Sequence, residues 1–213
     1  MRALVMAKAP VAGRVKTRLG AEIGMHAAAR VAAAALLDTL AACREACDDL
    51  HLALDGRLDG CIGERALRRQ LAGWTVHPQR GATLGERLAR AHRDAAGPGP
   101  TVQIGMDTPH VTAAQLRRAA ERTGEGQAVL GPAQDGGWWV LALQDPSAAS
   151  GLAGVRMSRT DTFRRTWEAL RGAGHTVHLA ETVRDVDTVA DAEAVAATQV
   201  DGHFRRAWQQ VSA

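Results

Sequence analysis

The chain has 213 residues, of which 46% are hydrophobic and 23% are charged, a composition that fits one globular domain and excludes the disordered and fibrous classes. Its formal net charge is +3, and it lacks the dense basic tracts with interleaved aromatic residues that mark a nucleic-acid surface. We therefore expect one domain, residues 1–213, with small anionic partners and no nucleic acid.

Strand and helix patterns alternate along the first half of the chain. The opening apolar run at 2–7 predicts a buried strand, and a loop with Pro and Gly at 8–19 separates it from a long helix that begins near residue 21. Further strands are expected at 50–54, 75–77 and 101–105. Further helices are expected from about residue 62, from about residue 84 and over 113–122.

The alternation continues toward the end of the chain, with strands expected at 127–131, 138–143 and 175–179 and helices at 160–170 and 189–198. The loops at 98–100 and 147–154 are too short to mark a domain boundary. Strands that alternate with helices are typical of a parallel sheet with helices on its faces. The sequence therefore predicts an α/β fold with one mainly parallel sheet in three α/β/α layers.

The absence of a long apolar run and the small number of cysteines exclude the membrane and disulfide-rich classes of protein. No run approaches the roughly 18 to 20 apolar residues of a membrane span, and the first residues do not resemble a signal peptide, so we expect a cytoplasmic protein with no membrane partner. The cysteines, Cys43, Cys47 and Cys61, are too few for a disulfide framework or a four-ligand zinc site. Cys43 and Cys47 are expected to be buried in an Ala-rich helix.

A basic loop follows the first predicted strand, and it contains both lysines of the chain, Lys8 and Lys16. Ligands of α/β proteins commonly bind at such a strand end. Gly13 allows a close backbone approach, and Arg14, Lys16 and Arg18 are spaced two apart, so in an extended loop they would point to one side and bind phosphates. Neither the P-loop motif nor G-x-G-x-x-G is present. A solvated basic loop is the alternative interpretation.

Asp107 follows the strand predicted at 101–105 and precedes a predicted helix. Thr112 and Gln115 have the spacing of a capping box, so this helix does not need Asp107 as its cap. The carboxylate is then free to bind a metal, and magnesium usually takes one or two protein carboxylates together with phosphate and water oxygens. An ordinary aspartate in a Pro-containing turn is the alternative.

Asp187 lies in a similar position before the helix predicted at 189–198. Thr188 and Asp191 have the spacing of a second capping box, which leaves Asp187 free. Asp185 competes with Asp187 for the role of metal ligand, and the sequence does not separate the two. Two spare carboxylates at two strand ends favour a site that binds metal and phosphate together.

Two other segments contain glycines beside polar residues. Asp135, Gly136 and Gly137 precede a strand, where the glycines form either a tight turn or a place for backbone amides to reach a ligand. The next residues, Trp138 and Trp139, face opposite sides of that strand, so one belongs to the core and the other can line a pocket.

The segment 79–87 enters the helix expected from about Leu84. It contains Gln79, Gly81 and Gly85, and the Gln amide could read the edge of a nucleotide base. The eight histidines show no metal-binding spacing. His110 lies near Asp107 and is interpreted either as a plain loop residue or as a substrate contact.

As a set, these loops resemble the glycosyltransferase A-like family of radical-SAM/selenodomain-associated transferases. The similar segments are 7–19, the Gly-x-Asp-x-Pro stretch around Asp107, 131–137 and 185–188, in the same order over nearly the whole chain. The chain is more distantly similar to 2-phospho-L-lactate guanylyltransferase, through residues 15–19, and to the molybdenum cofactor guanylyltransferases. Met106, Thr108 and Trp138 depart from residues common in these relatives, which affects the expected acceptor more than the metal.

The resemblance implies the fold of nucleotide-diphospho-sugar transferases, with Mg²⁺ or Mn²⁺ held at Asp107 and Asp187. Asp135, Gly136, Gly137 and Trp138 are expected to contact the second substrate. The residues expected to bind the nucleotide are Ala7, Lys8, Gly13, Arg14, Lys16, Arg18, Gln79, Gly81, Leu84 and Gly85.

The leading hypothesis for the reaction is nucleotidyl transfer, in which a small phosphorylated acceptor attacks the α-phosphate of a nucleoside triphosphate and pyrophosphate leaves. Arg14, Lys16 and Asp107 are the expected catalytic residues, since positioned charges can supply most of the acceleration. Glycosyl transfer from a nucleoside diphosphate sugar is the first alternative, and a non-catalytic nucleotide-binding protein is the second. The acceptor, the base preference and the oligomeric state, a homodimer included, stay open.

Overall fold

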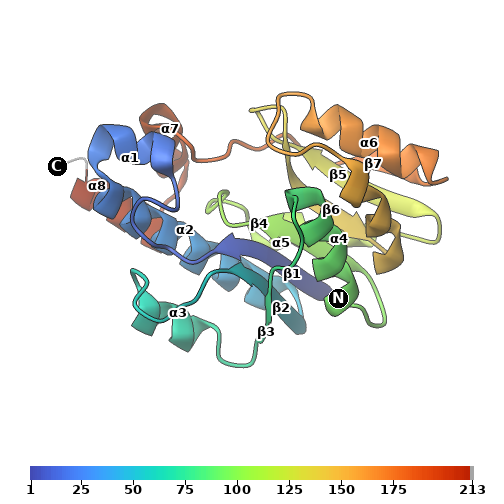
Figure 1. Cartoon of the computed structure of the whole chain (residues 1–213), viewed down its shortest axis with the longest axis horizontal. Helices are drawn as coiled ribbons and strands as arrows, with labels where there is room; N and C mark the ends of the chain where they lie inside the picture. Colours follow the sequence, from blue (N-terminus) through green and yellow to red (C-terminus); the bar gives the residue numbers. More distant parts are fainter. Residues whose placement is uncertain (212–213) are drawn as a thin grey trace.

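The computed structural model describes residues 1–211 and contains one sheet of seven strands with helices on both faces (Figure 1). The strand order is β3-β2-β1-β4-β6-β5-β7, and only β6 runs antiparallel to its neighbours. This arrangement confirms the predicted mainly parallel α/β fold. The strands are β1 (Arg2–Lys8), β2 (Asp49–Asp55), β3 (Thr75–Pro78), β4 (Thr101–Gly105), β5 (Gln127–Pro132), β6 (Trp138–Leu143) and β7 (Thr176–Leu179).

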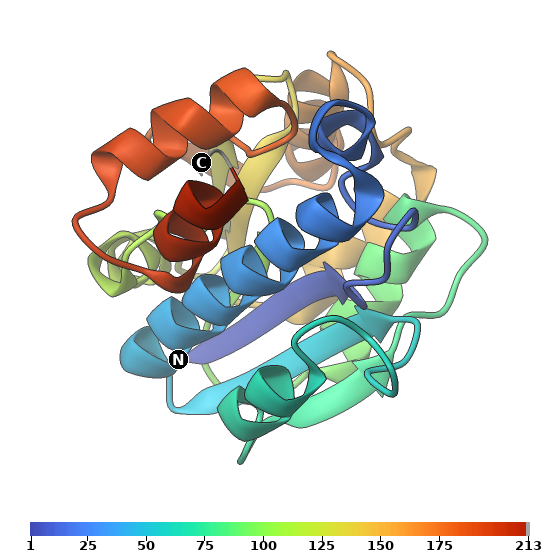
Figure 2. The same cartoon turned by 90° about the vertical axis from the view of Figure 1, so that its left-hand side faces the viewer.

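The helices form a layer on each face of the sheet and a third group at one end. One face is covered by α2 (Met25–Ala46), α3 (Glu64–Gln70) and α5 (Ala113–Glu121), and the other by α4 (Leu84–Asp94), the 3-10 helix η1 (Pro146–Gly154) and α6 (Thr162–Gly172). Figure 2 shows α2 crossing the sheet beside β1. The third group, α1 (Thr17–Ile23), α7 (Val189–Thr198) and α8 (His203–Val211), packs on the outer side of α2.

Strand β1 is apolar over residues 3–7 because both of its faces are covered. Leu4 and Met6 pack in the core beneath α4, whereas Ala3 and Val5 pack in the core beneath α2. Successive side chains of a strand point to opposite faces, so a strand between two helical layers reads as a continuous apolar run. Only Lys8, at its carboxyl end, is exposed.

Helix α2 has 22 residues and a mean hydropathy of 1.2, so by length and composition alone it could cross a membrane. Arg30 and Asp38 interrupt its apolar residues, so the helix contains no uninterrupted apolar run of the length that a membrane span needs. In the structure 67% of its apolar window is buried, as in the core helix of an α/β domain. Cys43 and Cys47 are buried at its end, as predicted.

The helix predicted from about residue 21 is two helices. Helix α1 begins earlier, at Thr17, and Gly24 both ends it and precedes α2. Gly24 has φ +89°, a conformation that glycine adopts without a steric penalty. Both predicted capping boxes, at Thr112 and at Thr188, are confirmed. Two elements differ from the prediction: η1 occupies a segment expected to be a loop, and α8 was not predicted.

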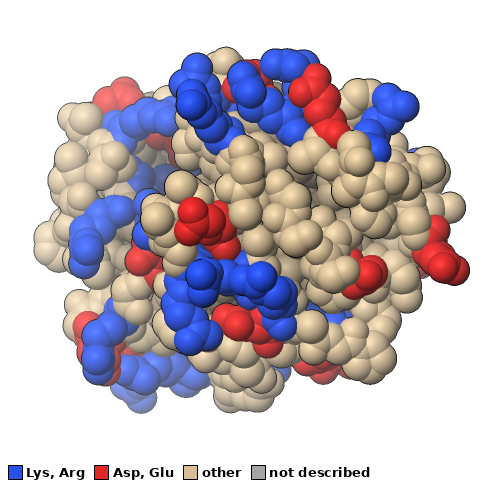
Figure 3. All heavy atoms as spheres, turned by 45° about the vertical axis from the view of Figure 1, so that its right-hand side comes forward, with Lys and Arg blue, Asp and Glu red and all other residues tan. Residues whose placement is uncertain are grey.

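Charged side chains are interspersed on the surface. Figure 3 shows basic and acidic groups beside one another, separated by broad areas without charge. Many of the arginines lie in ion pairs, such as Arg164 with Glu168 and Arg68 with Glu64. On this face the basic groups are therefore mixed with acidic ones rather than gathered in one stripe.

Candidate functional site

A cavity of about 730 Å³ lies at the carboxyl ends of β1 and β4. Its lining comes from the loop after β1, the segment after β4, the start of β6, the loop before α6 and the segment before α7. Parallel strands bring their carboxyl ends to one edge of the sheet, where ligands of open α/β sheets bind. Segments far apart in sequence therefore meet at this edge.

Lys16 lies between two carboxylates in this cavity. Its Nζ is 2.6 Å from Asp107 Oδ1 and 3.0 Å from Asp187 Oδ1, and its side chain is 4% exposed. Burial acts to lower the pKa of Lys16, but the two carboxylates outweigh it, so the pKa is raised above its ordinary value. The buried side chain is therefore an ammonium ion held by two anions.

The loop after β1 is not extended, which corrects the geometry assumed from the spacing of its cations. A turn places Gly13 at φ +77° and Lys16 in the left-handed region at φ 48°, and Val15 is buried between them. Arg14 and Arg18 are consequently exposed while Lys16 points inward. All three cations still line the cavity, but Lys16 lies in its interior and the arginines on its rim.

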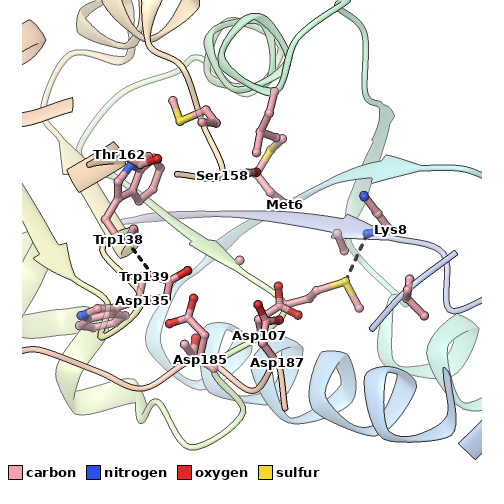
Figure 4. Close-up of a pocket in the computed structure, with 18 of the residues that line it drawn as sticks. Met6, Lys8, Asp107, Asp135, Trp138, Trp139, Ser158, Thr162, Asp185 and Asp187 are labelled. Atoms are coloured by element: carbon pink, nitrogen blue, oxygen red, sulfur yellow. Dashed lines mark hydrogen bonds between the residues drawn. The ribbon is translucent and has the colours of Figure 1, made fainter. Parts of the chain in front are cut away.

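Four aspartates line the cavity (Figure 4): Asp107, Asp135, Asp185 and Asp187. Burial, followed by repulsion from Asp135 and Asp107, raises the pKa of Asp185 to about 7. Its Oδ1 is buried and has no hydrogen-bond partner among residues 1–211. Asp107 and Asp187 are more open, with side chains 43% and 33% exposed.

Backbone bonds hold these aspartates together. Val186 N donates to Asp107 O at 2.9 Å, which joins the segment before α7 to the end of β4. Gln134 N donates to Val183 O at 3.0 Å, which joins the same segment to the turn after β5. The capping boxes meanwhile occupy other side chains, so the carboxylates of Asp107 and Asp187 stay available.

The carboxylates fit a divalent cation that also binds phosphate. Within residues 1–211 no group of three or more His, Cys, Asp or Glu side chains is placed to hold a metal ion. Magnesium does not need one, because it typically takes one or two carboxylates and completes its shell with phosphate and water oxygens. Asp185, through its unpartnered oxygen, and the pair Asp107 and Asp187 offer hard oxygen ligands. In this structure the ammonium of Lys16 contacts the pair.

Of the remaining predicted residues, most line the cavity and four glycines do not. Ala7, Lys8, Gln79 and Leu84 line the cavity on the side of β1 and α4, and Asp135, Gly137 and Trp138 line it on the side of β6. Four predicted glycines do not line it: Gly13, Gly81, Gly85 and Gly136.

Three of those four glycines lie where a side chain would collide with the protein. A Cβ at Gly81 would lie 2.8 Å from Glu86 Cβ, one at Gly85 would meet Leu152 O, and one at Gly136 would meet Thr160 O. These positions therefore permit close packing of the backbone.

The tryptophans take different environments. Both line the cavity, but Trp139 is buried and its Nε1 donates to Glu181 O at 2.8 Å, whereas Trp138 is half-buried and its Nε1 donates to Thr166 Oγ1 at 3.1 Å. His110 does not line the cavity, and burial lowers its pKa.

Several cavity residues were missed by sequence reasoning. They come mainly from the loop before α6 and from α4: Arg87, Leu88, Met157, Ser158, Arg159, Thr160 and Thr162. Ser158 has φ 58°, which is uncommon for a residue other than glycine. The signal that could have found this loop is its polar run directly before a helix, but such runs are common.

Comparison with known proteins gives a family and a fold. A family model described as "Uncharacterized protein conserved in bacteria (DUF2064)" matches residues 37–159, and comparison with curated proteins finds no match. A crystal structure from Desulfovibrio desulfuricans G20, provisionally described as a nucleotide-diphospho-sugar transferase, is 27% identical with a TM-score of 0.83, covering 99% of this chain and 94% of that one.

Two further solved structures show the fold alone. A nucleotidyl transferase from Methanothermobacter thermautotrophicus is 18% identical with a TM-score of 0.56, over 97% of this chain and 98% of that one. Rv0371c of Mycobacterium tuberculosis H37Rv, in complex with manganese, is 20% identical with a TM-score of 0.54, over 93% and 99%. The fold is thus that of nucleotide-diphospho-sugar transferases, as the resemblance implied.

Proposed function

The chain belongs to the family described as "Uncharacterized protein conserved in bacteria (DUF2064)", and we propose that it is a metal-dependent nucleotidyltransferase. In this proposal a nucleoside monophosphate passes from a nucleoside triphosphate to a small phosphorylated acceptor, and pyrophosphate leaves. The observation that carries it is one cavity lined by three cations of residues 14–18 and by four aspartates. Similarity to solved transferases supports the class of enzyme. The finer assignment to radical-SAM/selenodomain-associated transferases rests on the motifs.

The cations suit a triphosphate, which carries most of its charge on the departing pyrophosphate. Lys16 can exchange its carboxylate partners for phosphate oxygens with little movement, because its ammonium already lies in the cavity. Arg14 and Arg18 are exposed on the rim and can close over the outer phosphates. Preorganised positive groups stabilise charge that develops in the transition state, and they act more strongly where water is excluded.

The transfer step needs no nucleophile from the protein. An acceptor phosphate oxygen attacks the α-phosphorus, the bond from that phosphorus to the bridging oxygen breaks, and its electron pair leaves with pyrophosphate. Mg²⁺ or Mn²⁺ held at Asp107, with Asp187 or Asp185, would neutralise phosphate charge and polarise the α-phosphate. The protein contributes position and charge, which suffice for this class of reaction.

Glycosyl transfer is the second candidate, and two observations favour it. The half-buried indole of Trp138 borders the cavity, where an aromatic face can pack against a sugar ring. In addition, the Desulfovibrio protein with the TM-score of 0.83 is described as a nucleotide-diphospho-sugar transferase. The same cations and carboxylates would then hold a nucleoside diphosphate as leaving group.

One experiment separates these candidates. The purified protein is incubated with Mg²⁺, each common nucleoside triphosphate and a panel of sugar phosphates and other small phosphate monoesters, and pyrophosphate is measured. In parallel, nucleotide sugars are offered and nucleoside diphosphate is measured. Pyrophosphate that depends on acceptor supports nucleotidyl transfer. Release of nucleoside diphosphate without pyrophosphate would instead establish glycosyl transfer and reject the proposal.

Asp107→Asn provides a matched variant for this assay. Asp107 does not cap α5, whose cap is Thr112, and Lys16 keeps Asp187 as a partner. We therefore expect a folded protein whose metal-dependent turnover falls by roughly a hundredfold or more, in line with the loss of a preorganised charge. Full activity in this variant would remove Asp107 from the metal site.

A further inference from the structure

Gln79 follows β3 and reaches across the edge of the sheet toward β2 and β1. Its Nε2 donates to Ala7 O and to Ala53 O, each at 2.9 Å, while its backbone N donates to Leu54 O at 2.9 Å. Both hydrogens of the amide are therefore used. Rotating the amide by 180° would place its oxygen against two carbonyl oxygens, which repel it, so the orientation of the group is fixed.

The other end of this amide is left free. Gln79 Oε1 accepts no hydrogen bond within residues 1–211 and is not among the buried unpartnered atoms, so it is accessible, on a residue that lines the cavity. Leu84 lines the cavity too and is 43% exposed. An apolar side chain and a fixed acceptor that line the same cavity suit a flat heterocycle that packs on one group and donates to the other.

The loop that carries Gln79 is held in place by Arg87. Its Nε donates to Gly81 O at 3.1 Å and its Nη1 to Asp55 Oδ2 at 2.9 Å. These bonds join the loop to α4 and to the end of β2, so Oε1 is presented at a position set before any ligand arrives. A preorganised polar group discriminates more strongly than a mobile one, because it cannot turn to suit a different partner.

We propose that Gln79 is a specificity-determining residue whose Oε1 selects a nucleotide base that carries an exocyclic amino group. Cytosine, adenine and guanine present such a donor, whereas uracil and hypoxanthine carry a carbonyl oxygen at the corresponding position of cytosine and adenine. A base oxygen facing Gln79 Oε1 would leave two acceptors opposed and desolvated. This inference rests on the proposed function only in requiring a nucleotide in the cavity, and it holds for a triphosphate or a nucleotide sugar.

The test compares nucleotides that differ at one group. Binding of CTP and UTP, of ATP and ITP, and of GTP and ITP is measured by calorimetry with Mg²⁺ and without an acceptor. We expect the amino-bearing member of at least one pair to bind about tenfold more tightly, as for a single hydrogen bond that is replaced by an unpaired acceptor. Equal affinity within all pairs, or preference for UTP and ITP, would overturn the proposal.

Two variants link that ratio to Gln79. Gln79→Lys keeps donors for Ala7 O and Ala53 O but offers no acceptor, and Gln79→Leu removes both. In each variant we expect the affinity ratio of the discriminating pair to fall to about one, as expected when the only hydrogen bond that distinguishes the two bases is lost. A ratio that persists in both variants would overturn the assignment.

Inorganic tripolyphosphate is the control ligand, because it contacts the phosphate site without a base. Its binding should survive in Gln79→Leu, which shows that the variant is folded. The affinity ratio is measured without turnover, so it tests base selection by Gln79 separately from the proposed nucleotidyl transfer. Discrimination without pyrophosphate formation would reject nucleotidyl transfer and leave the role of Gln79 standing, whereas pyrophosphate formation with equal use of all bases would do the reverse.

Discussion

Lys16 Nζ lies 2.6 Å from Asp107 Oδ1 and 3.0 Å from Asp187 Oδ1, so one monovalent cation is shared by two carboxylates. The ammonium neutralises only one of the two negative charges, and the exposed Arg18 places its Nη1 3.4 Å from Asp187 Oδ2. A divalent cation at the same place would neutralise both and would release Lys16 toward the phosphates that arrive with the metal. Lys16 and the metal therefore compete for the same oxygens, and this competition can be measured.

Lys16→Met should make the protein more dependent on a divalent cation. Without metal, Asp107 and Asp187 lose their shared cation, and we expect a loss of roughly 1–3 kcal/mol, below the range for fully buried pairs because both carboxylates are partly exposed. With Mn²⁺ or Mg²⁺ present, the cation should restore much of this stability. Thermal melting with and without metal should therefore show a larger metal-induced shift in the variant than in the wild type.

Lys8→Met is the matched control, since Lys8 is the other lysine of the chain and is exposed with no ion pair among residues 1–211. Its metal-induced shift should equal that of the wild type. An unchanged shift in Lys16→Met would show that the metal does not use the oxygens that hold Lys16.

Asp107 and Asp187 could be predicted from sequence because each precedes a helix that has its own capping box. That reasoning left Asp107 and Asp187 free, and the structure places both in the cavity. The partnership of Lys16 with them could not be predicted, since it depends on a left-handed residue and a turn that reverse the direction of the side chain. The spacing alone suggested that Arg14 and Arg18 would point to the same side of the loop as Lys16.

Gly85→Ala tests whether this glycine serves packing or binds the nucleotide. A Cβ at Gly85 would meet Leu152 O and lie 3.0 Å from Val155 O, so α4 could no longer approach η1 so closely. Alanine favours a helix by about 1 kcal/mol over glycine, but overpacking costs about 1–3 kcal/mol. We expect a net loss of roughly 1 kcal/mol in urea unfolding, with nucleotide affinity nearly unchanged.

Gly172→Ala is the control for that substitution. Gly172 is the last residue of α6, and a Cβ there would have open space, so we expect neutral or increased stability. Should Gly85→Ala instead retain full stability and lose nucleotide affinity, Gly85 would belong to the binding site that its sequence context suggests.

His92 should make the protein less stable in acid. Burial lowers the pKa of His92 to about 4 in the folded state, against about 6.5 when unfolded. The unfolded state therefore binds more protons below pH 6.5, and stability is full above that pH and falls as the pH drops toward 4. The loss attributable to His92 should reach roughly 3 kcal/mol at pH 4.

His92→Gln removes this titration and keeps a polar side chain beside Gln103. Urea unfolding at pH 7 and pH 5 should show a smaller loss of stability in the variant than in the wild type, by about 2 kcal/mol. Equal losses would mean that His92 titrates normally, and an imidazole NMR signal that titrates near pH 6.5 would lead to the same conclusion.

Helix α8 shows why the end of the chain was harder to predict than its start. Strand β1 contains the continuous apolar run 3–7, which sequence alone reveals. Helix α8 has its apolar side chains, Phe204 and Trp208, one turn apart, but its capping carboxylate comes from α2, 165 residues earlier in the sequence. A cap supplied from another helix leaves no local signal.

Asp38→Ala should therefore destabilise the packing of α8 on α2. Asp38 Oδ1 accepts from His203 N at 2.9 Å and Oδ2 from Phe204 N at 2.8 Å, so the variant leaves two helix N–H groups without partners. We expect a loss of about 1–2 kcal/mol in the free energy of unfolding, as for other N-caps.

Asp201→Ala is the comparison, because Asp201 is an exposed partner of Arg206 in the same region, and such surface pairs contribute about 0–1 kcal/mol. Hydrogen exchange should show faster opening of α8 in Asp38→Ala than in Asp201→Ala, and equal rates would mean that burial of Phe204 holds the helix without its cap.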